Sequence, residues 1–396
     1  MTQTAGSAVE DRTAVTEALA RLPRVVDLLA ARAEEHDRDG TFPYQGIEAV
    51  HEAGLLTLTV AQKYGGAGGT LADTVRVLAQ LGRGDASVAV LTAFTLLQHA
   101  EQARTGAWPA AGYRRLLTES RRGPALVNTL RAEPEGAGPL PATVARWDGE
   151  AWLLTGRKAD CAGAEALAWM AVWARTEEPV PRVGTFLVRG DSEGVEIDPT
   201  WDQLGLRASA GHDVILDSVR VGPEGALKLA APGTAGAAES AAAETSRAWH
   251  DLALCAVHLG VARAAQEWLV RFLQQRTPAN LTEPLATLPR YRSALGEIEA
   301  ALIGAEELVY GLAAGVDRGE ASATARTGAA QLLVNRAVTG AVQQAVALTG
   351  NPGLSRRHPL ERYLRDVLSG RTHFPADEVV LEATGRAVLD RAARRS

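Results

Sequence analysis

The sequences ALVNTLRAEPEGAG at residues 125–138 and AWLLTGRKADCAG at residues 151–163 decide the fold class of this chain. Both contain short β-like runs, and clusters of Gly, Pro and Asp separate such runs from one another. Three further β-like runs follow at residues 167–174, 184–188 and 212–216. Short strands at this spacing predict a small β-sandwich or barrel in the middle of the chain.

Helical patterns lie on both sides of this β-rich segment. Upstream, residues 10–122 carry apolar side chains at helical spacing, with a break at Thr41–Pro43. Downstream, residues 229–247 are biased toward Ala and Gly and are expected to form a connector. From Ala248 onward the pattern is helical again.

The order of these segments predicts an α+β protein of three domains. We expect an N-terminal helical domain at residues 1–122, a central β-sandwich or barrel domain at residues 123–235, and a C-terminal four-helix bundle at residues 236–396.

Composition excludes several classes of protein. The 396 residues are 46% hydrophobic, so the chain can bury a large core. A formal net charge of −6 argues against nucleic acid or an anionic membrane surface as the main partner. The two cysteines, Cys161 and Cys255, cannot form a disulfide framework and are typical of a reducing compartment. There is no secretory signal and no apolar run of about 18 residues, so we expect a cytoplasmic protein without a membrane span.

Residue spacing alone does not name a reaction. The eight histidines show no paired metal-binding spacing, so no metal site is expected. The serine elbow of hydrolases, G-x-S-x-G, does not occur either. The glycine-rich loop Tyr64–Gly69 fits a close approach of backbone to a phosphate or a ring, and it equally fits a tight turn.

Six motifs, in order, resemble those of the acyl-CoA dehydrogenase superfamily, and they span most of the chain. They are GLL at 54–56 leading into YGGAGG at 64–69, GDASVA at 84–89, AEPEGAG at 132–138, WLLTGRK at 152–158, LGLRAS at 204–209 and PLERYLRD at 359–366.

The resemblance implies FAD, bound without a covalent link between the β domain and the C-terminal helices. It also implies a homo-oligomer, a dimer or tetramer, in which a neighbouring subunit completes the cofactor site. The positions that match the surroundings of the flavin ring are Thr129, Ala132 and Gly138 in one segment and Asp160, Cys161 and Ala162 in another. Arg276 matches the arginine that meets the cofactor's phosphates. Gly350 and Asn351 match the positions where the partner's backbone approaches the pyrophosphate.

Two of these positions depart from the family pattern. The family has a flavin-contacting threonine where this chain has Ala132, and a serine or threonine where it has Ala162. Two hydroxyl groups are therefore missing, and backbone N–H groups would have to supply those hydrogen bonds.

The largest departure concerns the catalytic base. The resemblance implies α,β-dehydrogenation of an acyl thioester, in which a glutamate removes the α-proton while a hydride moves to the flavin. Counted from Arg365 and Asp366, the slot of that glutamate holds Phe374, which cannot accept a proton. The remaining candidates for the base are His373, His250 and Asp251.

The segment around His373 also resembles a branch of the superfamily that contains flavin-dependent monooxygenases. These take reduced FMN or FAD from a separate reductase and oxygenate aromatic or other small substrates. His99 is then expected to line the substrate pocket with Phe374. A dehydrogenase needs an electron-transfer partner instead of a flavin reductase. A third reading is an inactive member that serves as a binding protein.

Overall fold

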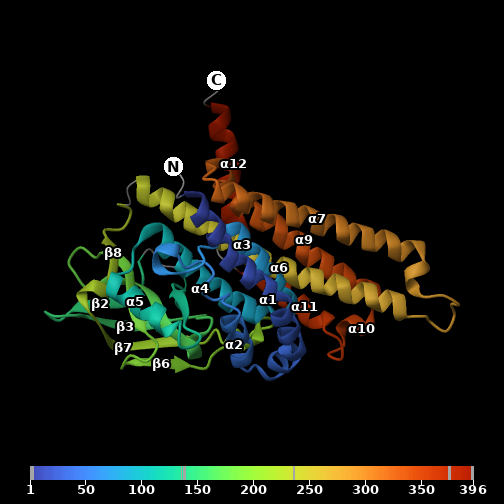
Figure 1. Cartoon of the computed structure of the whole chain (residues 1–396), viewed down its shortest axis with the longest axis horizontal. Helices are drawn as coiled ribbons and strands as arrows, with labels where there is room; N and C mark the ends of the chain where they lie inside the picture. The colour runs from blue at the N-terminus through green and yellow to red at the C-terminus, as the bar shows by residue number, and fades with distance from the viewer. Residues whose placement is uncertain (1–3, 135, 137–139, 235–236, 373–375, 394–396) are drawn as a thin grey trace.

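The chain folds in the order helices, strands, helices, as predicted (Figure 1). The computed structural model describes residues 4–134, 136, 140–234, 237–372 and 376–393. The strands gather at one end of the molecule and the long helices extend from them toward the other end (Figure 1). The predicted α+β fold class is therefore confirmed.

The N-terminal helices are α1 (Thr4–Asp39), α2 (Tyr44–Glu52), α3 (Leu71–Gly84), α4 (Ala86–Thr105) and α5 (Ala110–Glu119). Side chains before α3 and α4 explain where these two helices begin. Thr70 and Asp73 form a capping box at the start of α3. The Asp85 carboxylate accepts hydrogen bonds from the backbone N–H groups of Ser87 and Val88 at the start of α4.

The central strands are β1 (Leu126–Leu130), β2 (Val144–Trp147), β3 (Trp152–Lys158), β4 (Leu167–Thr176), β5 (Val183–Arg189), β6 (Val195–Asp198), β7 (Asp213–Val221) and β8 (Ala226–Ala230). They form one sheet in the order β6-β7-β3-β2-β4-β5-β8, and β1 pairs with β4 in parallel. Alternating burial along the strands, as in β3, places one face of the sheet on the core.

The C-terminal helices are α6 (Ala237–Gln275), α7 (Pro289–Asp317), α8 (Ala321–Thr324), α9 (Thr327–Thr349), α10 (Asn351–Leu354), α11 (Leu360–Leu368) and α12 (Asp377–Ala393). The expected connector at residues 229–247 is wrong in its second half, because α6 already begins at Ala237. Alanine has the highest helix propensity, so an Ala-rich segment continues the helix that follows it.

Helices α3 and α6 join the N-terminal and C-terminal parts of the chain. Gly82 on α3 faces the carbonyl of Val257, and Gly260 on α6 faces the carbonyl of Ala79. A Cβ atom at either glycine would overlap the facing backbone, so both glycines are needed for this close packing. The Asp317 carboxylate, at the end of α7, accepts hydrogen bonds from the first two backbone N–H groups of α3.

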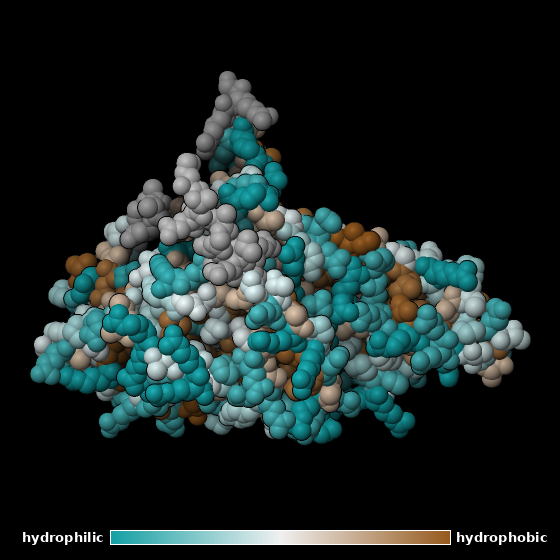
Figure 2. Space-filling model, in the orientation of Figure 1, coloured by the Kyte–Doolittle hydropathy of each residue, from teal (hydrophilic) through white to brown (hydrophobic). Residues whose placement is uncertain are grey.

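Hydrophilic residues cover most of the face in Figure 2, and brown apolar residues are scattered among them. In the described part of the chain, no helix is both long and apolar enough to cross a membrane.

Candidate functional site

The ends of β1 and β3 bring together the two segments that the sequence suggested for a flavin. The backbone N–H of Ala159 donates to the carbonyl of Ala132 at 3.0 Å. The Asn128 amide donates to the carbonyl of Ala162, also at 3.0 Å. Ala132 and Asp160 remain exposed at this end of the sheet. The two segments therefore lie side by side and present backbone and short side chains to solvent.

A buried ion pair holds the two segments in place. Lys158 Nζ lies 2.6 Å from Glu133 Oε1, and the two side chains are 0% and 8% exposed. Glu133 also accepts hydrogen bonds from Ala142 N, Thr143 N and Thr143 Oγ1. Burial alone would raise the pKa of Glu133, but these donors and the Lys158 ammonium outweigh it and lower the pKa to about 2.

One face of α4 connects this end of the sheet to α6. The Gln98 amide donates to Thr129 Oγ1 at 2.5 Å. One turn earlier on α4, the Phe94 ring stacks on the His250 ring with 6.3 Å between centroids. We call the surface formed by Phe94, Gln98, Thr129 and His250 the junction site, because α4, β1 and α6 meet there. All four side chains are half-buried, so the protein's own side chains leave them partly accessible.

His250 and Asp251 differ sharply in their access to the junction site. The His250 side chain is 35% exposed, whereas that of Asp251 is 0% exposed. Asp251 Oδ2 accepts a hydrogen bond from Thr327 Oγ1 at 3.1 Å. Its other oxygen, Oδ1, lies 3.9 Å from His250 Nδ1 and has no hydrogen-bond partner among the described residues. Of these two base candidates, the imidazole is the one that solvent reaches.

Two other candidates lie in the protein interior. His99 is fully buried, its Nδ1 lies 3.0 Å from the Tyr113 hydroxyl, and burial lowers its pKa to about 4. Cys161 is also buried, and burial raises the pKa of its thiol to about 12. A neutral thiol is a poor nucleophile, so no covalent role is expected for Cys161. Whether His99 lines a substrate pocket stays a prediction.

Arg276 lies far from the junction site of its own chain. It follows the last residue of α6, and the 26 positions between His250 and Arg276 correspond to about 39 Å of helix. Gly350 and Asn351 come at the end of α9 and the start of α10, where the bundle is remote from the sheet (Figure 1). The resemblance implies that Gly350 and Asn351 approach the cofactor of a neighbouring subunit, and that Arg276 meets the cofactor's phosphates. Both roles stay predictions. Gly138, His373 and Phe374 lie outside the described residues.

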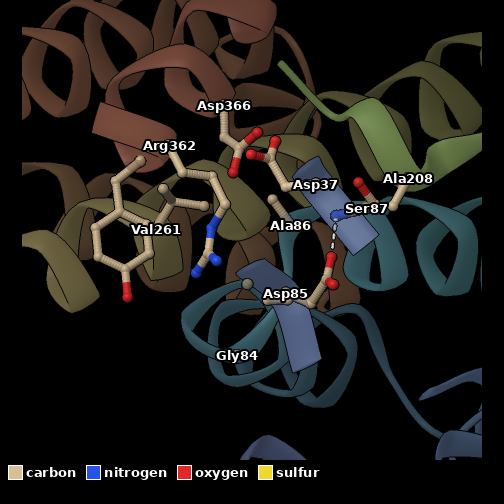
Figure 3. A pocket seen from close by; sticks show the side chains of 12 residues that line it. Asp37, Gly84, Asp85, Ala86, Ser87, Ala208, Val261, Arg362 and Asp366 are labelled. Atoms are coloured by element: carbon tan, nitrogen blue, oxygen red, sulfur yellow. Dashed lines mark hydrogen bonds between the residues drawn. The ribbon is translucent and has the colours of Figure 1, made fainter. Parts of the chain in front are cut away.

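Figure 3 shows a pocket that is separate from the junction site. It lies where α1, the start of α4 and α11 meet, and Asp37, Asp85, Arg362 and Asp366 line it. The carboxylates of Asp37 and Asp366 lie side by side in this view. The pocket is thus a charged contact between parts of the chain that are distant in sequence.

Sequence reasoning missed Phe94 and Gln98. Both are ordinary residues in an otherwise buried helix, and no motif marks them. Their spacing of four residues was the available signal, since it puts both on one face of α4.

Comparisons with known proteins identify the family. Models of the N-terminal, middle and C-terminal domains of acyl-CoA dehydrogenases match residues 14–103, 134–219 and 252–378. The putative acyl-CoA dehydrogenase YdbM of Bacillus subtilis is 30% identical over 91% of this chain and 93% of its own length. The chain belongs to the acyl-CoA dehydrogenase family. Membership of this family indicates an oxidoreductase.

Proteins with other names are also similar to this chain. The amino sugar nitrososynthase DnmZ of Streptomyces peucetius is 29% identical over 89% of this chain and 88% of its own length. The solved structure of KijD3 in complex with FMN and a dTDP-amino-keto sugar is 26% identical, with a TM-score of 0.82 over 96% of this chain and 94% of KijD3. Butyryl-CoA dehydrogenase from Megasphaera elsdenii, 22% identical with a TM-score of 0.83 over 96% of this chain and 98% of that enzyme, shares the fold.

Proposed function

We propose that this chain is a flavin-dependent monooxygenase that transfers one oxygen atom of O2 to a small substrate. The electrons come from NADH or NADPH through a separate flavin reductase. One observation carries the proposal. At the junction site the accessible base candidate is the imidazole of His250, while the carboxylate of Asp251 is buried and bonded to Thr327. The dehydrogenation that the resemblance implies uses a carboxylate to remove the thioester α-proton, and the candidate carboxylate of Asp251 is closed to solvent. Oxygen transfer to an electron-rich nitrogen, sulfur or ring carbon requires no carboxylate, and an imidazole can exchange a proton with such a substrate.

The junction site and the adjoining end of the sheet fit a flavin. Beside the junction site, exposed Ala132 and Asp160 present backbone on the sheet side, and the backbone of Asp160 is left-handed with φ 52°. Phe94 and His250 offer aromatic rings on the helix side. A reduced flavin held there would supply the two electrons that let one oxygen atom of O2 enter the substrate while the other leaves as water. The residues of this chain would position the ring, and His250 would exchange a proton with the substrate.

A matched pair of measurements tests the proposed function. We expect O2 consumption and a product heavier by one oxygen atom when the chain is mixed with a flavin reductase, NADH, free FMN or FAD, and a panel of small amines, sulfur compounds and aromatics. Anaerobic incubation with acyl-CoAs is expected to leave oxidised flavin yellow. Bleaching of bound flavin by an acyl-CoA without O2 would overturn the proposal.

Bleaching by an acyl-CoA would instead support dehydrogenation, which is the second candidate function. One contact in the structure favours this second candidate. The free Oδ1 of Asp251 lies 3.9 Å from His250 Nδ1. A small rotation of the imidazole would let the carboxylate accept a hydrogen bond from His250 and strengthen it as a base.

Replacing His250 with alanine is expected to lower turnover at least tenfold, which corresponds to about 1.4 kcal/mol in the barrier. Histidine side chains exchange protons near neutral pH, and His250 is placed to take one from the substrate or give one back. The measurement is turnover at saturating substrate, with His51→Ala on α2 as the control histidine. Full activity of His250→Ala would remove this residue from the mechanism.

A further inference from the structure

Two arginines beside the junction site are held against tryptophan rings. The guanidinium of Arg131 lies 4.7 Å from the centre of the Trp173 ring. The pairing of β1 with β4 explains this contact, because Leu130 is opposite Val172 and the next residues along both strands are Arg131 and Trp173. A flat aromatic face holds a guanidinium in one orientation and leaves its edge of N–H groups free to bind a ligand.

The second arginine comes from α4. The guanidinium of Arg104 lies 4.7 Å from the centre of the Trp249 ring on α6. Arg104 also donates a hydrogen bond to Ser246 Oγ at 3.2 Å. Trp249 is directly followed by His250 of the junction site, so this stacked pair adjoins it along α6.

A third arginine, Arg247, completes a basic cluster. It lies three residues before His250 on α6 and directly follows Ser246, which accepts the hydrogen bond from Arg104. Burial lowers the pKa of Arg131 most, Glu101 opposes this, and the charge of Arg247 adds to the lowering. Arg104, Arg131 and Arg247 are all exposed, and none forms an ion pair with a carboxylate of the described residues. The nearby carboxylate of Glu101 is paired with Lys228 at 3.5 Å, and it also acts to raise the pKa of Arg104 and Arg131 against the lowering by burial. The positive charge at this end of the junction site is therefore only partly neutralised.

We propose that Arg104, Arg131 and Arg247 bind an oxyanion group of the substrate, a carboxylate or a phosphate. The proposal adds a binding site to the proposed function. It rests on that function because the bound anion is taken to be part of the substrate. Guanidinium groups bind such anions through parallel N–H donors. Arg131 comes directly after the end of β1 and follows Thr129 by two residues, and Arg247 precedes His250 by three residues on α6. The anionic group would therefore bind beside the junction site.

Calorimetric titration of the purified chain at low ionic strength tests the anion site directly. The probes are inorganic pyrophosphate and malonate, which separate phosphate from carboxylate recognition. We expect saturable binding of at least one probe, and a tenfold or larger loss of affinity in Arg131→Gln and in Arg247→Gln. Arg131→Lys is expected to retain part of the affinity, since it keeps the charge and loses the planar fork. Arg146→Gln on β2, also an exposed arginine, is the control and should bind like the parent chain.

Two results would overturn the anion site: no saturable binding of either probe, or an equal loss in Arg146→Gln. Thermal unfolding of each variant checks that it is folded. The titration needs neither flavin nor O2, so it is separate from the test of the proposed function. Anion binding without oxygenation would support the anion site and contradict the monooxygenase function. Oxygenation without anion binding would support the monooxygenase function and contradict the anion site.

Discussion

Replacing Lys158 with methionine is expected to lower the free energy of unfolding by about 3–5 kcal/mol. The ammonium of Lys158 is fully buried, and it is 2.6 Å from the almost fully buried carboxylate of Glu133. Its removal leaves that carboxylate in the interior with only its bonds to Ala142 and Thr143. The same pair joins the loop after β1 to the end of β3, so flavin affinity is expected to fall with stability.

Urea unfolding of the parent chain and the variant measures this effect. Lys228→Met is the control, because the Lys228 side chain is 55% exposed and an exposed ion pair contributes less than about 1 kcal/mol. Adding Glu133→Gln to Lys158→Met is expected to recover part of the lost free energy of unfolding, because the double variant no longer buries an unpaired carboxylate. A loss below about 1 kcal/mol for Lys158→Met would show that the pair does not stabilise the fold.

The same carboxylate predicts acid sensitivity. The folded pKa of Glu133 is lowered to about 2 from an ordinary value of 4.5. A depressed pKa means that the stabilisation is complete above about pH 4.5 and is lost as the pH falls toward 2. The difference in stability between the parent chain and Glu133→Gln should therefore shrink across this window.

Replacing Asp366 with asparagine is expected to stabilise the protein at alkaline pH and to have little effect below about pH 4. Burial is the main cause that raises the pKa of Asp366 from 3.8 to about 7, and the neighbouring carboxylates of Asp37 and Asp85 raise it further. The charge of Arg362 and the hydrogen bond from Leu206 N act in the opposite direction. Asp366 and the side chains of Asp37, Asp85 and Arg362 line the pocket of Figure 3. A raised pKa in the folded state means that the neutral acid is the favoured form, so stability falls as the pH rises through about 7.

The expected slope is about 1.4 kcal/mol per pH unit between roughly pH 4 and 7. The measurement is the free energy of unfolding at several pH values for the parent chain minus that for Asp366→Asn. Asp202→Asn is the control, because the Asp202 side chain is 92% exposed. A difference that does not change with pH would mean that Asp366 is ionised in the folded protein throughout this range.

The sequence by itself predicted the order of the elements and the pairing of two motifs. Helical and β periodicities are local properties, so the α–β–α order could be read without knowing any contact. The resemblance to the family placed residues 129–138 and 160–162 at one site, and the adjoining side chains of Lys158 and Glu133 do lie together. Local composition misled only where an Ala-rich segment continued α6.

Only the tertiary structure decided which side chains share the candidate site. Phe94 and Gln98 belong to it because α4 crosses between β1 and α6, and residues as far apart as Phe94 and His250 meet through packing that no local pattern encodes. The rise of a helix places Arg276 about 39 Å from His250, so it cannot serve the site of its own chain. Asp251 is likewise buried and hydrogen-bonded to Thr327 because α6 packs against α9. The sequence determines which functional groups the chain carries, whereas contacts between distant segments determine which of these groups solvent or a ligand can reach.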